Sequence, residues 1–157
     1  MAGEWNLAEF KVEDLLQMAV LMQQKGYDFY SAVIEKSPER RVKNEIRFLR
    51  EEEARHKVLF QEMLKKKGKS ASGRLSAALD ALLRREFTNP LEELIFSKKI
   101  ESSEEALKFG VAMEQKVVDF YAVLKDLPGA SPLAADLATV SAEDQAHVSK
   151  LNAMLSY

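Results

Sequence analysis

The chain contains an internal repeat that covers most of its length. Residues 22–30 read MQQKGYDFY, and residues 113–121, which lie 91 positions later, read MEQKVVDFY, so six of the nine positions are identical. The same offset, without a gap, relates Glu52, Glu53 and His56 to Glu143, Asp144 and His147. Long repeats usually form helical arrays, but two copies are too few for a solenoid. Two helix pairs that close on each other predict a four-helix bundle.

Apolar residues recur every three or four positions in four segments, which is the spacing of an amphipathic helix. The predicted helices run from Val12 to about Lys36, from about Pro38 to Lys67, from about Ser103 to just before Pro128, and from Ser131 to the C-terminus. Between the two pairs, residues 68–102 form a long crossover with a short amphipathic helix that we expect to end at Asn89-Pro90. We therefore predict one all-α domain, a ferritin-like four-helix bundle whose helix pairs are residues 12–67 and 103–157.

Composition excludes several classes of protein. The chain has 23 Lys and Arg against 25 Asp and Glu, a formal net charge of −2, which argues against a nucleic-acid partner. It has no cysteine, so it has no disulfide, thiolate zinc site, cysteine-ligated iron–sulfur cluster or catalytic thiol. With two histidines, any metal site must depend on carboxylates. Neither a membrane span nor a signal peptide is evident, so we expect a cytoplasmic protein without a membrane partner.

Polar residues interrupt the apolar face of each predicted helix. Glu53 and His56 are three residues apart and lie on one face of the second helix, and Asp144 and His147 repeat this arrangement on the fourth. Glu114 has an equivalent place on the third helix, and Gln23 has it on the first. Carboxylates and imidazoles are costly in a core unless they are satisfied. Glu-x-x-His on two helices, with one carboxylate from each of the others, is the ligand set of di-iron carboxylate bundles.

These motifs resemble the rubrerythrin-like branch of the ferritin superfamily over roughly Val12 to Leu155. The segment Gln23-x-x-Gly26-x-x-Phe29-Tyr30 resembles the Glu-x-x-Gly-x-x-Phe-Tyr motif of the family's first helix. The matches on the other three helices are Glu52-Glu53-x-x-His56, Glu114 through Phe120-Tyr121, and Asp144-x-x-His147.

The resemblance implies a di-iron centre that reacts with peroxide or dioxygen, or that oxidises ferrous iron. It implies that Glu53 and Asp144 bridge the two ions. Glu114 and His147 would complete one ion, and Gln23 and His56 the other. Tyr30 and Tyr121 would donate hydrogen bonds around the ligands, a role that tunes such sites.

Two positions depart from the family pattern, because Gln23 and Asp144 both stand where the family has glutamate. Three carboxylates then face the four positive charges of two ferrous ions, so we expect weaker binding beside Gln23 and His56. A single-metal site at Glu114, Asp144 and His147, with or without a share from Glu53, is an alternative, and manganese or zinc could replace iron. Because the chain has no cysteine, it lacks the rubredoxin-type module of full-length rubrerythrins, and turnover would require an external electron donor.

Each of these residues also has a simpler interpretation. The histidines can be core residues satisfied by carbonyls or carboxylates, Gln23 a buried amide, and Tyr30 and Tyr121 packing residues. Three hypotheses for function therefore stay open: a metal-dependent oxidoreductase, a non-catalytic iron-binding protein, and a metal-free helical interaction module. We expect Glu51 and Glu52 to be exposed. We also expect Trp5-Asn6-Leu7 and the crossover to cover a neighbouring subunit in a homodimer.

Overall fold

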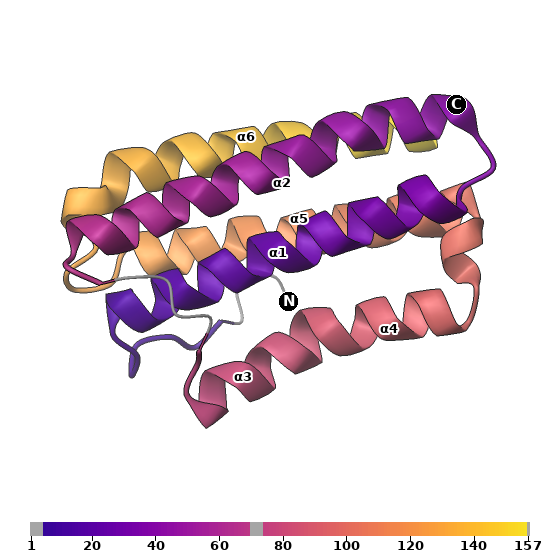
Figure 1. Cartoon of the computed structure of the whole chain (residues 1–157). Helices are drawn as coiled ribbons and strands as arrows, with labels where there is room; N and C mark the ends of the chain where they lie inside the picture. The colour runs from indigo at the N-terminus through magenta and orange to yellow at the C-terminus, as the bar shows by residue number, and fades with distance from the viewer. Residues whose placement is uncertain (1–4, 70–73, 157) are drawn as a thin grey trace.

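The computed structural model describes residues 5–69 and 74–156, and within these ranges it is all helical, without a β-strand. Four long helices form two antiparallel pairs that lie side by side (Figure 1). These helices are α1 (Val12–Lys36), α2 (Arg40–Lys66), α5 (Ser103–Lys125) and α6 (Ala134–Leu155). The first pair is α1 with α2 and the second is α5 with α6, as the repeat predicts. The prediction of an all-α chain is confirmed.

The crossover runs along the bundle and packs beside α1 and α5 (Figure 1). It consists of α3 (Ala77–Leu83), a π-helical turn η1 (Arg84–Thr88), α4 (Asn89–Phe96) and a short 3₁₀ turn η2 (Lys99–Glu101). The prediction that the helix ends at Asn89-Pro90 is wrong, because the helical path continues through the π turn into α4. The lost backbone donor of Pro90 would normally leave the carbonyl of Glu86 without a partner. The Nζ of Lys116 donates to that carbonyl instead, at 2.8 Å.

The ends of the long helices follow local sequence signals at most positions. The side chain of Ser102 accepts a hydrogen bond from the backbone N–H of Glu105 and caps α5. Gly68, with φ of +75°, follows α2 in the left-handed conformation that glycine adopts readily. The predicted start of α2 at Pro38 is two residues early. Ser37 accepts from the N–H of Glu39 at 3.2 Å, and this local bond accompanies an extended stretch before Arg40.

The N-terminal segment packs against its own bundle. Leu7 is 1% exposed, and the Trp5 ring packs against Phe120 with 5.4 Å between the ring centroids. The Trp5 indole N–H donates to the carbonyl of Lys116 at 3.0 Å. Leu79 and Leu83 of the crossover are buried in the same core. These contacts lie within one chain, and the covering of a neighbouring subunit by these segments stays a prediction. Within the described ranges, no helix combines the length and apolar character needed to cross a membrane.

Candidate metal centre

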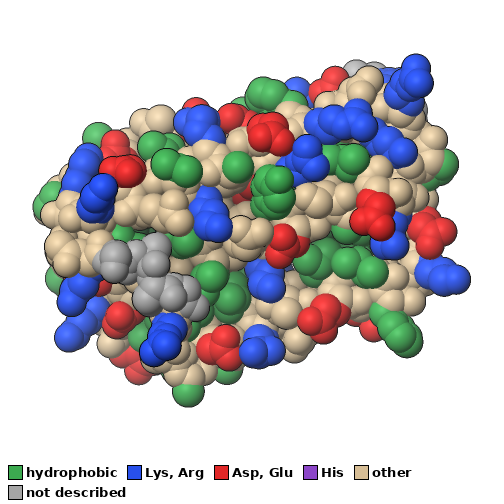
Figure 2. Space-filling view, viewed as in Figure 1, with side chains coloured by type: hydrophobic (Ala, Val, Ile, Leu, Met, Phe, Trp, Pro, Cys, Tyr) green, Lys and Arg blue, Asp and Glu red, His purple; other side chains and the backbone are tan. Residues whose placement is uncertain are grey.

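The structure places all six predicted ligand residues in the interior, where each is at most 4% exposed. They come from all four long helices: Gln23 from α1, Glu53 and His56 from α2, Glu114 from α5, and Asp144 and His147 from α6. Figure 2 shows no histidine on the face of the molecule that α1, α2 and the crossover helices form. The polar side chains on the inward faces of the four helices thus lie together inside the bundle.

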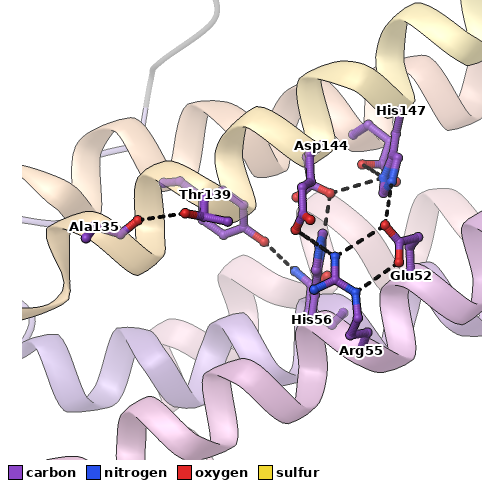
Figure 3. A network of polar contacts seen from close by, with 11 residues as sticks. Glu52, Arg55, His56, Ala135, Thr139, Asp144 and His147 are labelled. Carbon is purple, nitrogen blue, oxygen red and sulfur yellow. Dashed lines mark hydrogen bonds and ion pairs between the residues drawn. The ribbon is translucent and has the colours of Figure 1, made fainter.

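The two histidines face each other across Asp144. Their ring centroids are 5.9 Å apart and the rings are nearly parallel. Oδ1 of Asp144 lies 3.3 Å from Nδ1 of His56 and 3.2 Å from Nδ1 of His147 (Figure 3). Nδ1 of His147 also lies 3.7 Å from Oε2 of Glu114. Although Asp144 is one methylene shorter than the glutamate of the family pattern, its Oδ1 lies at nearly equal distances from Nδ1 of the two imidazoles.

The outer nitrogens of the histidines face a second pair of carboxylates. Nε2 of His56 lies 2.9 Å from Oε1 of Glu143, and Nε2 of His147 lies 3.6 Å from Oε1 of Glu52. The repeat exchanges these two pairs, so each histidine is backed by a glutamate from the opposite helix. Such contacts fix the orientation of an imidazole that binds a metal through its other nitrogen.

A single arginine joins the two outer carboxylates. The guanidinium of Arg55 donates to Glu52 at 3.0 Å and pairs with Glu143 at 2.7 Å (Figure 3). Glu52, His56 and Glu143 have atoms close enough to hold a cation, but the guanidinium already lies 3.4 Å from Nε2 of His56. We therefore interpret this outer cluster as the support of the histidines and not as a second metal site.

Sequence reasoning missed this outer cluster. It placed Glu52 on the exposed surface, and that prediction is wrong because the Glu52 side chain is 19% exposed and ion-paired. A signal was available, since Glu52 and Glu143 occupy equivalent positions in the two repeats. Arg55 carried no such signal, because its equivalent in the second repeat is Ala146.

Two buried tyrosines contact the site from opposite helices. The hydroxyl of Tyr30 donates to Oε1 of Glu114 at 2.8 Å, and Nε2 of Gln23 donates to the hydroxyl of Tyr121 at 2.6 Å. The repeat exchanges these two pairs as well. The bond to Tyr121 holds the Gln23 amide so that Oε1 is left free. This buried oxygen has no hydrogen-bond partner among the described residues.

Gly26 makes room for the carboxylate of Glu53. A Cβ at this position would lie 2.7 Å from Cδ and 2.8 Å from Oε2 of Glu53, closer than non-bonded atoms approach. The equivalent residues of the second repeat are Val117 and Asp144, both buried. In the second repeat, the larger side chain of Val117 thus occurs together with a carboxylate that is one methylene shorter. This pairing gives a physical reason for one of the two departures from the family pattern.

The charges of the site shift one another's pKa values. Burial raises the pKa of Glu53 well above its usual range, and the nearby charge of Glu114 raises it further. Burial alone would lower the pKa of His147, but the carboxylates of Asp144 and Glu114 outweigh it and raise that pKa to about 10. His56 shifts upward for the same reasons, with Asp144 as its main carboxylate neighbour. In turn the histidines outweigh the effect of burial on Asp144 and lower its pKa. The shifts thus favour protonated histidines beside a deprotonated Asp144, and they favour the neutral form of Glu53.

Several buried polar atoms of the site form no hydrogen bond with any described residue. They are Oε1 of Gln23, Nδ1 of His56, Oε2 of Glu114, both carboxylate oxygens of Asp144, and Nδ1 of His147. Buried polar groups without partners are rare in native proteins, and each one requires an explanation. Glu114, Asp144 and His147 also offer three atoms that lie within 4.8 Å of one another. Carboxylate and amide oxygens together with imidazole nitrogens are a donor set that suits iron or manganese.

Comparisons with protein-family models, curated proteins and solved structures found no match to this chain. Its function must therefore be inferred from its own side chains.

Proposed function

We propose that the chain is a ferritin-like bundle of the rubrerythrin type that binds two iron ions and acts as an oxidoreductase on peroxide, dioxygen or ferrous iron. Two features of the fold support the bundle type. Its four long helices form two antiparallel pairs, and a crossover that runs along the bundle joins them (Figure 1). Such a single long connection is typical of ferritin-like folds.

The buried polar atoms at the centre that form no hydrogen bond with any described residue are the observation that carries this proposal. Leaving such a group buried costs about 1–3 kcal/mol, and more when the group is charged. All six belong to residues that the sequence predicts as ligands. Ion pairs of 3.2–3.7 Å join Nδ1 of the two histidines to Oδ1 of Asp144 and Oε2 of Glu114, and Oε1 of Gln23 has no partner among the described residues. A bound cation would satisfy these atoms together. A chance arrangement of core residues would not explain why they lie at one place.

The residues divide into two groups that could each hold one ion. Glu114 and His147 form one group, and Gln23 and His56 form the other. Asp144, whose Oδ1 lies between the two Nδ1 atoms, and Glu53 are the proposed bridging carboxylates. When bound, two iron ions would supply the electrons that reduce peroxide or dioxygen, and an external donor would restore them.

The other residues of the site hold these groups in place. Tyr30 keeps Glu114 oriented through its hydrogen bond, and Glu143 and Glu52 do the same for the two histidines. The Tyr30 side chain is 0% exposed, and burial together with the charge of Glu114 raises its pKa well above the usual value. It therefore stays a neutral hydrogen-bond donor at physiological pH.

A second candidate function is iron binding without catalysis. One observation favours it, namely that the amide of Gln23 supplies no charge where the family pattern has a carboxylate. The ion beside Gln23 and His56 would then bind more weakly than its neighbour. Adding peroxide to the reduced protein and following the iron absorbance distinguishes this candidate, which should not react, from the first.

The test is metal analysis of protein purified from iron-replete cells, followed by anaerobic loading with ferrous iron. We expect two iron ions per chain and an increase in near-ultraviolet absorbance when peroxide is added to the reduced protein. Replacing both His56 and His147 by glutamine, which keeps a polar side chain, should abolish binding while circular dichroism shows an intact helical fold. A wild-type chain that binds no metal would favour the metal-free interaction module.

A further inference from the structure

Basic residues are concentrated on α2. This helix holds nine of the chain's 23 Lys and Arg but only five of its 25 Asp and Glu. The near-neutral total is thus the sum of one positive helix and an acidic remainder. Figure 2 shows Lys and Arg side chains gathered over the first turns of α2, at the upper right of the view.

Most of these basic residues lie in one stripe along the outside of α2. Eight positions, spaced by three or four residues, share one face of the helix. Six of the eight are basic, none is acidic and none is buried: Arg40, Lys43, Arg47, Arg50, Ala54, Lys57, Gln61 and Lys65. We call the six basic residues the basic stripe.

The second repeat has no such stripe. The eight equivalent positions, each 91 residues later, carry no charged side chain: Ser131, Ala134, Ala138, Ser141, Gln145, Val148, Asn152 and Ser156. Both repeats form the same kind of helix pair, so the bundle itself does not require a basic stripe. Its presence on α2 needs another explanation.

The acids nearby leave the first half of the stripe positive. Residues 35–51 contain six Lys and Arg and four acids, which are Glu35, Glu39, Glu45 and Glu51. Glu45 pairs with Lys150 of α6 at 3.0 Å, and Glu51 pairs with Arg50 at 3.2 Å. Among the described residues, no carboxylate forms an ion pair with the other three stripe residues of this range, Arg40, Lys43 and Arg47. The positive end of the α2 dipole lies at the same end of the helix.

The stripe borders a groove between α1 and α2 that leads to the candidate metal centre. Lys57 of the stripe lines this groove together with Gln23 and Glu53, two of the proposed ligands, which are 1% and 4% exposed. The guanidinium of Arg50 lies 5.6 Å from the ring centroid of Tyr27, which also lines the groove. A protein that docks on the stripe would therefore lie over the side of the bundle from which the groove reaches two proposed ligands.

The proposed oxidoreductase needs electrons from outside the chain, which has no cysteine for an iron–sulfur module of its own. A carrier of one electron must dock twice to return two ferric ions to the ferrous state, and the first carrier must leave before the second arrives. Weak redox complexes of this kind have small interfaces. Complementary charge speeds their formation without making them permanent.

We propose that the basic stripe of α2 is the docking surface for an acidic one-electron redox protein, which reduces the metal centre from the α1–α2 side. The reduced carrier donates one electron and leaves in its oxidised form, and the electron converts one ferric ion into a ferrous ion. This inference rests on the proposed function, because such a carrier needs a redox-active site to reduce.

The first experiment measures docking alone, on the full chain without metal. The probe is oxidised flavodoxin, a small acidic protein that carries a flavin. An NMR titration at about 0.01 M salt should shift the backbone signals of residues 40–57 and leave those of the equivalent residues 131–148 in place. Raising the salt to about 0.15 M should weaken binding at least about tenfold, because surface charges are then screened. Shifts of equal size on both helices would overturn the proposed surface.

A pair of charge-matched variants tests the stripe itself. The stripe variant combines Arg40→Gln, Lys43→Gln and Arg47→Gln, and it should weaken flavodoxin binding at about 0.01 M salt at least about tenfold. The control variant removes three exposed lysines outside α2, through Lys11→Gln, Lys99→Gln and Lys125→Gln. It has the same net charge and should bind flavodoxin like the wild type. Equal weakening in both variants would show a response to net charge alone and would overturn the inference.

The second experiment measures electron transfer to the iron-loaded chain. In stopped-flow mixing with reduced flavodoxin at about 0.01 M salt, the stripe variant should be reduced at least about tenfold more slowly than the wild type and the control variant. Excess dithionite should reduce the iron of all three proteins to the same final extent, which shows that the site is intact.

A short DNA duplex tests the other class of polyanion that a basic stripe can attract. Because the whole chain has a formal net charge of −2, we expect the duplex to bind more weakly than flavodoxin at about 0.15 M salt. Tighter binding of the duplex, lost in the stripe variant, would overturn our choice of partner.

The possible failures are distinguishable. A chain that binds no iron contradicts the proposed function, and this inference fails with it. A chain that binds iron, and that flavodoxin reduces at the same rate in the wild type and in the stripe variant, retains the proposed function and overturns the inference alone.

Discussion

Replacing Gly26 by alanine should damage the metal site and leave the fold almost unchanged. The added Cβ would lie 2.7 Å from Cδ of Glu53, whereas ordinary van der Waals contact begins at 3.4 Å. The carboxyl group must therefore move by about 0.7 Å. It can do so by rotating, because it is the end of a flexible side chain.

The expected magnitudes differ for the site and for the fold. A displacement of about 0.7 Å exceeds the roughly 0.2 Å by which metal–ligand distances vary in well-formed sites. We therefore expect a loss of about 10- to 100-fold in metal affinity, the range seen when support of a ligand is removed. Alanine in place of glycine within a helix contributes up to about 1 kcal/mol of stability, which offsets part of the crowding. The free energy of unfolding should thus change by no more than about 1 kcal/mol.

Anaerobic titration with ferrous iron and urea unfolding measure these two quantities separately. Gly110→Ala is the matched control, because its Cβ would lie 3.2 Å from a terminal methyl of Leu151, away from the site. It should leave iron affinity unchanged. Adding Glu53→Asp to Gly26→Ala imitates the Val117–Asp144 pairing and should recover part of the affinity. Wild-type affinity in Gly26→Ala would refute the role that we assign to Glu53.

Three further predictions follow from contacts of the site and the core. The metal-free protein should lose stability as pH rises from 6.5 through about 10, because the raised pKa of His147 makes its protonated form the favoured one in the fold. Each unit of that pKa shift is worth about 1.4 kcal/mol of stability. Urea unfolding at pH 7 and at pH 9.5 should reveal the loss. Equal free energies of unfolding at the two pH values would contradict the ion pairs of His147. Arg55→Gln should weaken iron binding by about 10- to 100-fold in the same titration, because Glu52 and Glu143 are released, while Arg84→Gln at an exposed ion pair should not. Trp5→Ala should destabilise the chain by about 3 kcal/mol at every protein concentration, and a loss confined to dilute samples would indicate an intersubunit role instead.

The helices and their buried faces could be predicted from the sequence because both depend on local periodicity. Leu16, Met22 and Tyr30 follow the spacing of a helix face, and all three are at most 1% exposed. The six candidate ligands could be located for the same reason, since their positions on each helix determine that they point inward. The repeat then indicated that the four inward faces belong to one site.

Features that depend on contacts between distant segments could not be predicted in this way. The carbonyl of Glu86 within the π turn accepts a hydrogen bond from Lys116, which is 30 residues away along the chain. The position of Glu52 depends on Arg55 and on the opposite helix. The packing of Trp5 against Phe120 joins residues more than 100 positions apart. In each case contacts between distant segments accompany the feature, and the local sequence pattern carries little information about them.

Arg55 also bears on the history of the duplicated chain. Because its counterpart is Ala146, two copies of the first half would bring two guanidinium groups toward one axis, and two copies of the second half would bring none. One guanidinium now serves both halves. The halves have thus become complementary parts that are no longer interchangeable, because the second half depends on a guanidinium of the first to neutralise its outer glutamate.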